Sequence, residues 1–283
     1  MKNPWNLAKL SILGVILIIV YLPAFEWMWR QWNVSEGYYS HGLLIFIAAV
    51  YFLWLKRPQL RALTALDSSS VGFAGIGVAV ILHIFAMVFR MYFLSAFSLP
   101  VMLGGIALLW GGFPVLRIIF FPLMYLYFMV PLPLVIISNL SFRMKIFAAQ
   151  ASTSLLTGIG IDAVLRGSTI VMPHSYLEIE LPCSGLRSLI SLTAFGAAFA
   201  YMATLSRIRK WILFFMAVPI ALCANICRIV LLGWVSEVYG MEAAQGWVHD
   251  ASGFVLFGVA VFGLAVMYII VKPSGEEIET EER

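Results

Sequence analysis

Charged residues are scarce in this chain of 283 residues, at 11% of the sequence, and cysteine occurs only three times. Soluble domains carry about 25% charged residues, so this chain has too few to cover a surface exposed to water. Three cysteines are also too few for a disulfide scaffold. Hydrophobic residues make up 62% of the sequence, which excludes intrinsic disorder and requires much of the apolar surface to face lipid. The composition therefore predicts a polytopic membrane protein.

Eight hydrophobic stretches are predicted to cross the bilayer, for which a helix needs about 20 mostly apolar residues. They are Leu10–Phe25, His41–Leu55, Val71–Phe89, Tyr92–Gly111, Ile118–Ile137, Cys183–Leu205, Trp211–Trp234 and Ser252–Val271. We expect an all-α polytopic fold, with about eight transmembrane helices forming a single transmembrane domain over residues 1–272. Residues 273–283 are rich in glutamate, and we expect them to form a disordered acidic tail in the cytoplasm.

Lys and Arg residues are unevenly distributed between the two sides that eight crossings would define. With the N-terminus inside, eleven of the eighteen fall on the inner face, five fall on the outer face, and Arg187 and Arg228 fall within spans. The five outer residues are Arg30, Arg90, Arg143, Lys145 and Arg166. Because cytoplasmic loops carry the excess of Lys and Arg, we expect both termini to be cytoplasmic. The net charge of +4 does not indicate nucleic-acid binding, since the basic residues are scattered.

The longest segment between predicted spans, Ser138–Pro182, then lies on the outer face. Its first half has apolar residues at helical spacing, which indicates a helix lying in the membrane interface. These residues are Leu140, Met144, Phe147, Ala151 and Leu155. Thr169–Val171 and Tyr176–Leu181 are rich in β-forming residues, and the second stretch alternates apolar and polar positions. We expect them to form a small β-hairpin between spans five and six that leads directly into Cys183.

Nucleophilic and ionisable side chains in or beside the predicted spans converge on the outer face. Such residues are costly in a membrane, so each is a candidate functional residue. Cys183 begins the sixth span at the outer face, and His249 stands just before the eighth. Arg228 lies 17 residues beyond Trp211, about 25 Å along a helix, and so it also approaches the outer face. Three separate helices thus bring a thiol, a guanidinium and an imidazole to one side of the membrane.

These three residue types form a coherent set for acyl transfer through a thioester. A cysteine thiolate is the nucleophile, and a nearby histidine accepts or delivers the proton. The five fixed donors of Arg228 suit the oxyanion of a tetrahedral intermediate. Arg187, one helical turn after Cys183, is expected to lower the pKa of the thiol or to bind a substrate carboxylate. Asn225, three residues before Arg228, is expected to orient the guanidinium.

His41 competes with His249 for the role of general acid or base. It lies at the outer mouth of the second predicted span, and neither side nor depth distinguishes the two histidines. A zinc site is disfavoured, because Cys223 lies more than one helical turn deeper than Arg228. We therefore expect no metal and no other cofactor. His83, alone within the third span, is interpreted as a hydrogen-bonding residue of helix packing.

Several blocks of the sequence resemble motifs of the exosortase/archaeosortase family. In chain order they are Tyr39-Ser40-His41-Gly42, Pro131-Leu132-Pro133, Pro182-Cys183-Ser184-Gly185-Leu186-Arg187-Ser188-Leu189, Asn225-Ile226-Cys227-Arg228-Ile229 and His249-Asp250-Ala251-Ser252-Gly253. The resemblance runs from about residue 20 to residue 270, with the blocks in the right order and at the right spacing. Any one of these blocks alone would be a weak signal, whereas their ordered combination is a strong one.

The resemblance implies a polytopic cysteine transpeptidase of the cytoplasmic (inner) membrane, with its active site facing the periplasm or exterior. Its substrates would be exported proteins with a C-terminal sorting signal: a short PEP-like motif, one transmembrane helix and a basic tail. Cleavage would be followed by transfer to a surface acceptor of unknown identity. By match of motif, Cys183 is the nucleophile, Arg228 stabilises the oxyanion or substrate, and His249 is the acid/base. The same blocks imply supporting or substrate-binding roles for Tyr39, His41, Ser184, Gly185, Arg187 and Asn225.

Two other classes of function remain open on the residues alone. Pro122, Pro131 and Pro133 would suit a broken helix around the midplane site of a transporter, although the unusual polar groups gather at one face instead of along a path. Alternatively, the chain is a structural subunit of an envelope polysaccharide export system in which the motif residues only pack. The second possibility would leave a Cys183→Ala variant fully functional.

We predict that position 209 faces the cytoplasm and position 166 faces outward, because of the asymmetry of Lys and Arg. In a background without native cysteines, Arg166→Cys should react with a membrane-impermeant maleimide added to intact cells, whereas Arg209→Cys should react only after permeabilisation. Labelling of position 209 but not of position 166 from outside would overturn the assignment of the active face.

Overall fold

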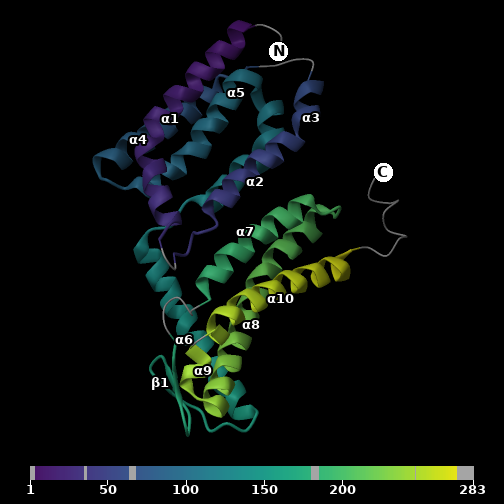
Figure 1. Ribbon diagram of the computed structural model, residues 1–283. Coiled ribbons are helices and arrows are strands. Elements are labelled where there is room, and N and C mark those ends of the chain that lie inside the picture. The colour runs from purple at the N-terminus through teal and green to yellow at the C-terminus, as the bar shows by residue number, and fades with distance from the viewer. Residues whose placement is uncertain (1–3, 35–36, 64–67, 180–184, 246, 273–283) are drawn as a thin grey trace. The chain divides into compact units, whose positions relative to one another are not determined.

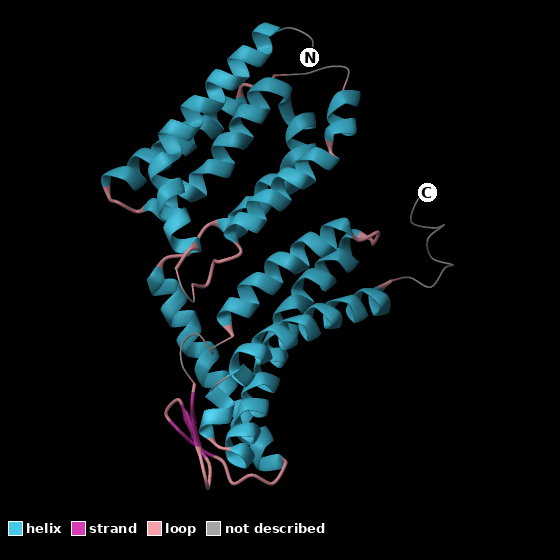
Figure 2. Cartoon of the chain, viewed as in Figure 1, coloured by secondary structure: helices cyan, strands magenta, loops and turns pink. Residues whose placement is uncertain are grey.

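The structure is a computed structural model that describes residues 4–34, 37–63, 68–179, 185–245 and 247–272. For residues 4–10, 245 and 247–250 it describes the course of the backbone and not the side chains. The chain divides into two compact units, Met1–Pro133 and Leu134–Arg283 (Figure 1). Most of the described residues are helical (Figure 2).

The first unit consists of helices. They are α1 (Pro4–Trp32), α2 (Gly42–Leu55), α3 (Arg57–Ala62), α4 (Val71–Val88), α5 (Tyr92–Tyr125) and the short 3₁₀ helix η1 (Leu126–Met129). Helices α4 and α5 approach each other closely at Gly105, where an added Cβ would lie 2.8 Å from the backbone nitrogen of Ile76. The absence of a side chain at this position lets the two backbones pack together, as small residues do between membrane helices.

The second unit combines helices with a small sheet. Its elements are α6 (Leu134–Gly158), β1 (Val164–Arg166), β2 (Thr169–Val171), β3 (Tyr176–Glu178), α7 (Leu186–Met202), α8 (Arg207–Tyr239), α9 (Met241–Gln245) and α10 (Trp247–Val271). Helix α8 packs against α6, α7, α9 and α10. The buried core between α7, α8 and α10 contains Leu192, Ala200, Leu213, Ala217, Ala221, Ala260 and Leu264.

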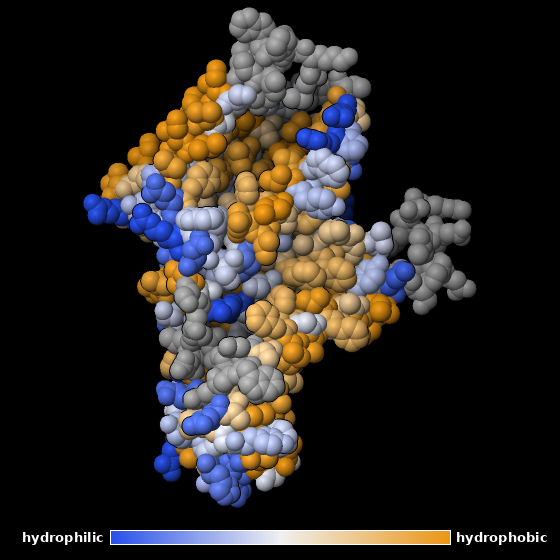
Figure 3. Space-filling view, viewed as in Figure 1, coloured by the Kyte–Doolittle hydropathy of each residue, from blue (hydrophilic) through white to orange (hydrophobic). Residues whose placement is uncertain are grey.

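Six described helices are long and apolar enough to cross a membrane. These segments are Ser11–Trp32, Gly42–Ala62, Val71–Val88, Tyr92–Met129, Arg207–Tyr239 and Ala251–Val271. Many large hydrophobic side chains are exposed on their outer surfaces, and hydrophobic residues cover much of the face seen in Figure 3. A lipid environment accounts for this exposure, because water would not stabilise so large an apolar surface. The chain is an all-α polytopic integral membrane protein.

The six segments accommodate the eight predicted stretches as follows. The predicted stretches Tyr92–Gly111 and Ile118–Ile137 both begin within α5, which bends at Gly112, where φ is 67° and ψ is −162°. The left-handed backbone at Gly112 interrupts the helix and divides α5 into two helical parts. Helix α7 matches the described part of the predicted stretch Cys183–Leu205, but its 17 residues make it shorter than the other candidates. The number of membrane crossings stays a prediction.

The fifth predicted stretch ends earlier than expected. Its helical structure stops at Met129 instead of Ile137, and Val130–Pro133 are not helical. Pro131 and Pro133 cause the break, since proline has no backbone N–H to donate and disfavours helical geometry at the preceding residue. The next helix, α6, therefore begins at Leu134 and includes the first residues of the predicted outer-face segment.

Helix α6 has a buried face and an exposed face. Of the predicted interfacial stripe, the side chains of Leu140, Phe147 and Leu155 are 39–53% exposed, whereas Met144 is buried at 8% exposure and belongs to the other face. The opposite side carries small residues such as Ala148 and Ser152, which are buried and allow close packing against α8. The exposed stripe is compatible with an interfacial helix, whose position in the bilayer stays a prediction.

The sheet between α6 and α7 contains one more strand than predicted. Strands β1, β2 and β3 pair antiparallel in that order, and β2 and β3 fall within the two predicted β-rich stretches. The sequence analysis missed β1. Ile170 and Ile179, 0% and 1% exposed, pack with Leu156 of α6 and Ile229 of α8. This cluster fixes the sheet to the helices on either side of the segment that contains Cys183.

Polar side chains join different elements at two places. In the first unit, His83 Nδ1 lies 2.9 Å from the hydroxyl of Ser95, in agreement with its interpretation as a helix-packing residue. In the second unit, the turn between β2 and β3 is bonded to the C-terminal end of α8. His174 Nδ1 lies 2.7 Å from a carboxylate oxygen of Glu237, and the Ser175 hydroxyl donates to the other oxygen at 2.9 Å. Glu237 thus holds the sheet to α8.

Candidate active site

The structure describes only some of the predicted site residues. Cys183 and Ser184 lie outside the described residues, and His249 belongs to α10 but its side chain is not described. Gly185 and Arg187 lie at the start of α7, and Asn225 and Arg228 lie in α8, all within the second unit. Tyr39 and His41 lie in the first unit, just before α2.

Gly185 brings the start of α7 directly against α8. Its φ is +81°, in the left-handed region that other residues adopt only at a cost. An added Cβ would lie 2.5 Å from Cγ of Asn225 and 2.8 Å from its Cβ and Nδ2. No other residue fits without displacing Asn225. The Cys motif therefore contacts the Arg motif through the backbone of Gly185.

Arg228 connects α8 to the first turns of α10. Its Nε donates a hydrogen bond of 3.1 Å to the hydroxyl of Ser252, which is 5% exposed. A Cβ on Gly253 would lie 3.8 Å from one terminal nitrogen of the guanidinium, an ordinary van der Waals contact. Because Ser252 and Gly253 belong to the same block as His249, the Arg motif contacts the His motif. The bond to Nε also fixes the plane of the guanidinium.

Asn225 lies one turn before Arg228 and is 5% exposed. Its Nδ2 has no hydrogen-bond acceptor among the described residues. A buried amide donor without an acceptor is costly, so it is a candidate for contact with substrate. The role of Asn225 in orienting Arg228 stays a prediction, and its side chain packs against the start of α7 at Gly185.

Arg187 lies in the first turn of α7. Its Nε and one terminal nitrogen are buried and make no hydrogen bond within the described ranges. A permanent positive charge in this position favours the ionised form of a nearby thiol or carboxylate. This chemistry fits both roles predicted for Arg187, and the geometry does not select between them.

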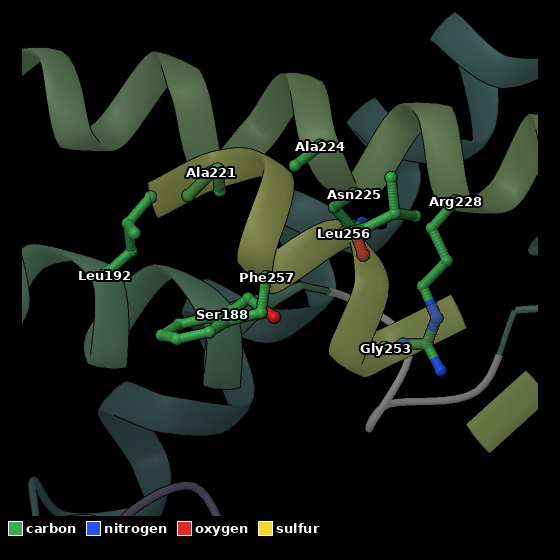
Figure 4. A pocket seen from close by; sticks show the side chains of 10 residues that line it. Ser188, Leu192, Ala221, Ala224, Asn225, Arg228, Gly253, Leu256 and Phe257 are labelled. Carbon is green, nitrogen blue, oxygen red and sulfur yellow. The ribbon is translucent and has the colours of Figure 1, made fainter. Parts of the chain in front are cut away.

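A small pocket with a cavity volume of about 20 Å³, partly open at its surface, lies beside Arg228 (Figure 4). Its lining residues are Ser188 and Leu192 of α7, Ala221, Ala224, Asn225 and Arg228 of α8, and Gly253, Leu256, Phe257 and Ala260 of α10. On α8 and α10 these positions follow the same pattern of i, i+3, i+4 and i+7, which is one face of a helix. Three helices thus each present one face to the same space.

Sequence reasoning missed two polar residues of this site. Ser252 positions Arg228, and Ser188 lines the pocket. The signal for Ser252 was its place three residues after His249, on the same helix face. The signal for Ser188 was weaker, because serine is common in membrane helices as a packing residue.

Two motifs of the first unit pack against each other. Tyr39 is 6% exposed, and its ring stacks on that of His41 with centroids 6.0 Å apart. Burial raises the pKa of the Tyr39 hydroxyl, and a hydrogen bond from the Leu132 backbone opposes this change. The indole N–H of Trp32 donates to the carbonyl of Met129 at 2.9 Å, and a Cβ on Gly42 would overlap this indole. The block around His41 is thus packed against the chain around Leu132.

The described cysteines are free thiols of α8. Cys223 and Cys227 are both exposed on this helix. Among the residues that the structure describes, no three His, Cys, Asp or Glu side chains are grouped as metal ligands.

We predict that Gly185→Ala destabilises the protein more than Gly160→Ala. Both glycines have positive φ, +81° and +93°, so both variants carry backbone strain of about 1–2 kcal/mol. Only position 185 adds a collision with Asn225, since nothing lies within 4 Å of a Cβ at position 160. Thermal unfolding in detergent should show the larger loss for Gly185→Ala, with partial recovery in the double variant Gly185→Ala/Asn225→Ala. Equal losses for the two single variants would contradict the close approach.

A comparison with protein families identifies the chain. The family model of transmembrane exosortases matches residues 29–266, which includes every motif block described above. Searches of curated proteins and of solved structures found no match. The family match spans most of the chain and both compact units. The chain belongs to the transmembrane exosortase family.

Proposed function

We propose that the chain is a membrane-embedded cysteine transpeptidase that cleaves the C-terminal sorting signal of exported proteins. The signal comprises a short PEP-like motif, one transmembrane helix and a basic tail. Cleavage takes place at the outer face of the cytoplasmic membrane, and the trimmed protein passes to a surface acceptor. Membership of the exosortase family supports this function, and so does the concentration of polar motif residues around Arg228.

The observation that carries the proposal is the contact between Gly185 and Asn225. Cys183 precedes Gly185 by two residues, so covalent geometry limits the distance between their Cα atoms to about 7 Å. Gly185 in turn lies against Asn225, one helical turn from Arg228. This contact between the Cys motif and the Arg motif supports a common site for the two.

The His motif reaches the same neighbourhood from α10. Position 249 precedes Ser252 and Gly253 by one helical turn, so all three positions share one face of that helix. Arg228 contacts this face through Ser252 and Gly253. Contacts within the second unit thus support a common site for Cys183, Arg228 and His249.

The reaction follows from these three groups. His249 accepts the proton of Cys183, and the thiolate attacks the scissile carbonyl carbon to form a tetrahedral intermediate. Arg228 donates hydrogen bonds to the developing oxyanion. The C–N bond then breaks, the leaving amine takes the proton from His249, and a thioester remains on Cys183. A nucleophile of the acceptor attacks the thioester, His249 takes its proton, and the thiol is regenerated.

We predict that Arg228→Lys loses most of the activity although the charge is kept. Lysine supplies a point charge without the planar pair of donors, and it lacks the Nε that Ser252 orients. Removal of one oxyanion donor typically lowers the rate about 10²–10³-fold. The measurement is turnover of a protein that carries the sorting signal, with Cys223→Ser on the exposed face of the same helix as the control. Near-normal turnover by Arg228→Lys at equal protein level would exclude an oxyanion role.

We predict that His249, not His41, exchanges the proton with Cys183. A thiol of pKa near 8.5 is only slightly ionised at neutral pH, and a group of pKa near 6.5 can both accept its proton and later protonate the amine. Purified His249→Ala should form neither thioester nor product, whereas His41→Ala should form the thioester at a reduced rate. Acyl-enzyme on Cys183 is measured by mass spectrometry.

The opposite result for the two histidines would reverse the assignment. If Cys183→Ala still cleaves the substrate, the thiol mechanism itself is wrong. If Cys183→Ala supports full surface assembly in cells, the structural-subunit interpretation is correct instead.

A further inference from the structure

Helix α2 and the short helix α3 that follows it change in polarity along their length. The 14 residues of α2 include no charged side chain, and apolar side chains such as Leu44, Ile47 and Val50 are exposed along it. Its exposed side chains become aromatic toward the end of α2, and three cations then occur within the six residues Lys56–Arg61. Apolar, aromatic and cationic side chains thus follow one another within Gly42–Ala62.

The aromatic side chains are those of Tyr51 and Trp54. Their rings stack with centroids 6.1 Å apart, and they are 48% and 53% exposed. Tyrosine and tryptophan concentrate where the hydrocarbon of a bilayer meets the headgroups, because each combines an apolar ring with a polar O–H or N–H group. The pair therefore marks the level along α2 at which lipid tails give way to headgroups.

Arg57 and Arg61 lie just beyond this aromatic pair. Arg57 follows Trp54 by three residues and Arg61 follows Arg57 by four, so the three side chains lie on successive helical turns. Both arginines are exposed, and within the described residues neither belongs to an ion pair. Hydrophilic residues occupy in Figure 3 the place that α3 has in Figure 1. Two guanidinium groups on adjacent turns suit a phosphate group, whose oxygens accept paired N–H bonds.

The first unit contains little negative charge that could neutralise these arginines. Residues 37–133 contain five Lys and Arg residues and a single acidic residue, Asp67, which lies outside the described residues. The described part of the first unit has one acidic residue, Glu26, and its carboxylate lies 3.7 Å from the guanidinium of Arg30. That pair lies toward the end of α1 that contacts the start of α2, through Trp32 and Gly42. The α3 end of α2 therefore carries an uncompensated positive charge.

We propose that the junction of α2 and α3 binds the headgroup of an anionic phospholipid. Arg57 and Arg61 donate hydrogen bonds to the phosphate oxygens, Trp54 lies at the level of the glycerol, and the acyl chains extend along the apolar side of α2. A headgroup with a net negative charge is preferred to phosphatidylcholine, whose positive choline group would be repelled by the two guanidinium groups. The inference does not rest on the function proposed above.

The size of the effect follows from the two charges. Each Lys or Arg beside an anionic membrane surface increases the affinity about fivefold, so the loss of both arginines should weaken binding of the lipid about 25-fold. Salt should reduce the preference of the wild-type protein for the anionic lipid, because both arginines are exposed.

The test measures binding of phosphatidylglycerol to the full-length protein in detergent by native mass spectrometry. Arg57→Gln/Arg61→Gln should weaken this binding about 25-fold and should leave binding of phosphatidylcholine unchanged. The matched control is Arg143→Gln/Arg166→Gln, which removes two exposed cations from the second unit and should have little effect. Undiminished binding by Arg57→Gln/Arg61→Gln would overturn the site, and so would an equal loss in both double variants, since net charge alone would then attract the lipid.

Thermal unfolding distinguishes a lipid headgroup from free phosphate. In nanodiscs of phosphatidylcholine, addition of phosphatidylglycerol should raise the Tm of the wild-type protein and of the control, and should raise that of Arg57→Gln/Arg61→Gln less. Inorganic phosphate in the buffer should not reproduce this increase. If it stabilises the wild-type protein as much as phosphatidylglycerol does, the arginines bind free phosphate and the assignment to a lipid is wrong.

Fluorescence quenching locates the lipid on the chain. In a background without native cysteines, a fluorophore is attached at Gln59→Cys, between the two arginines, or at Gln150→Cys, an exposed position of α6. Each protein is placed in nanodiscs that contain a trace of phosphatidylglycerol or phosphatidylcholine with the same nitroxide on the acyl chain. The ratio of quenching by the two lipids should be higher at position 59 than at position 150, and replacement of both arginines should remove the difference. Equal ratios at the two positions would overturn the proposal.

Discussion

The close approach of Gly185 to Asn225 is the contact on which the site depends. It places the backbone of one motif against the side chain of another with no room for an intervening atom. A single turn farther along α8, Arg228 bonds to Ser252 and so links the same helix to α10. Two contacts on successive turns of α8 thus hold the starts of α7 and α10 together. Farther along, the same three helices pack through apolar residues.

In the first unit, too, contacts join motifs that are distant in the sequence. The block around Tyr39 and the break at Pro131 and Pro133 are about 90 residues apart in sequence. They meet because Tyr39 is bonded to the Leu132 backbone and Trp32 to Met129. Because the prolines interrupt the helix, backbone groups of Met129 and Leu132 are left without partners inside a helix. The side chains of Trp32 and Tyr39 form hydrogen bonds with these groups instead. The shape of this region therefore comes from hydrogen bonds to an interrupted helix.

Hydropathy and motif order predicted the class of the fold and the helices that bear the candidate site, because a lipid-facing helix must be apolar along its length. The prolines indicated a break near residue 130, but not that a new helix starts at Leu134. Local composition did not reveal the bend at Gly112 or the third strand, Val164–Arg166. The pocket could not be predicted either, since its lining comes from three helices and depends on which faces of them meet.

The residues that flank the segment 180–184 both contact the same helix. Ile179 packs with Ile229, and Gly185 lies against Asn225, one turn earlier on α8. A chain segment whose two ends are anchored on one rigid helix keeps the separation of those ends when the helix moves. Any displacement of α8 would therefore carry both flanking residues with it.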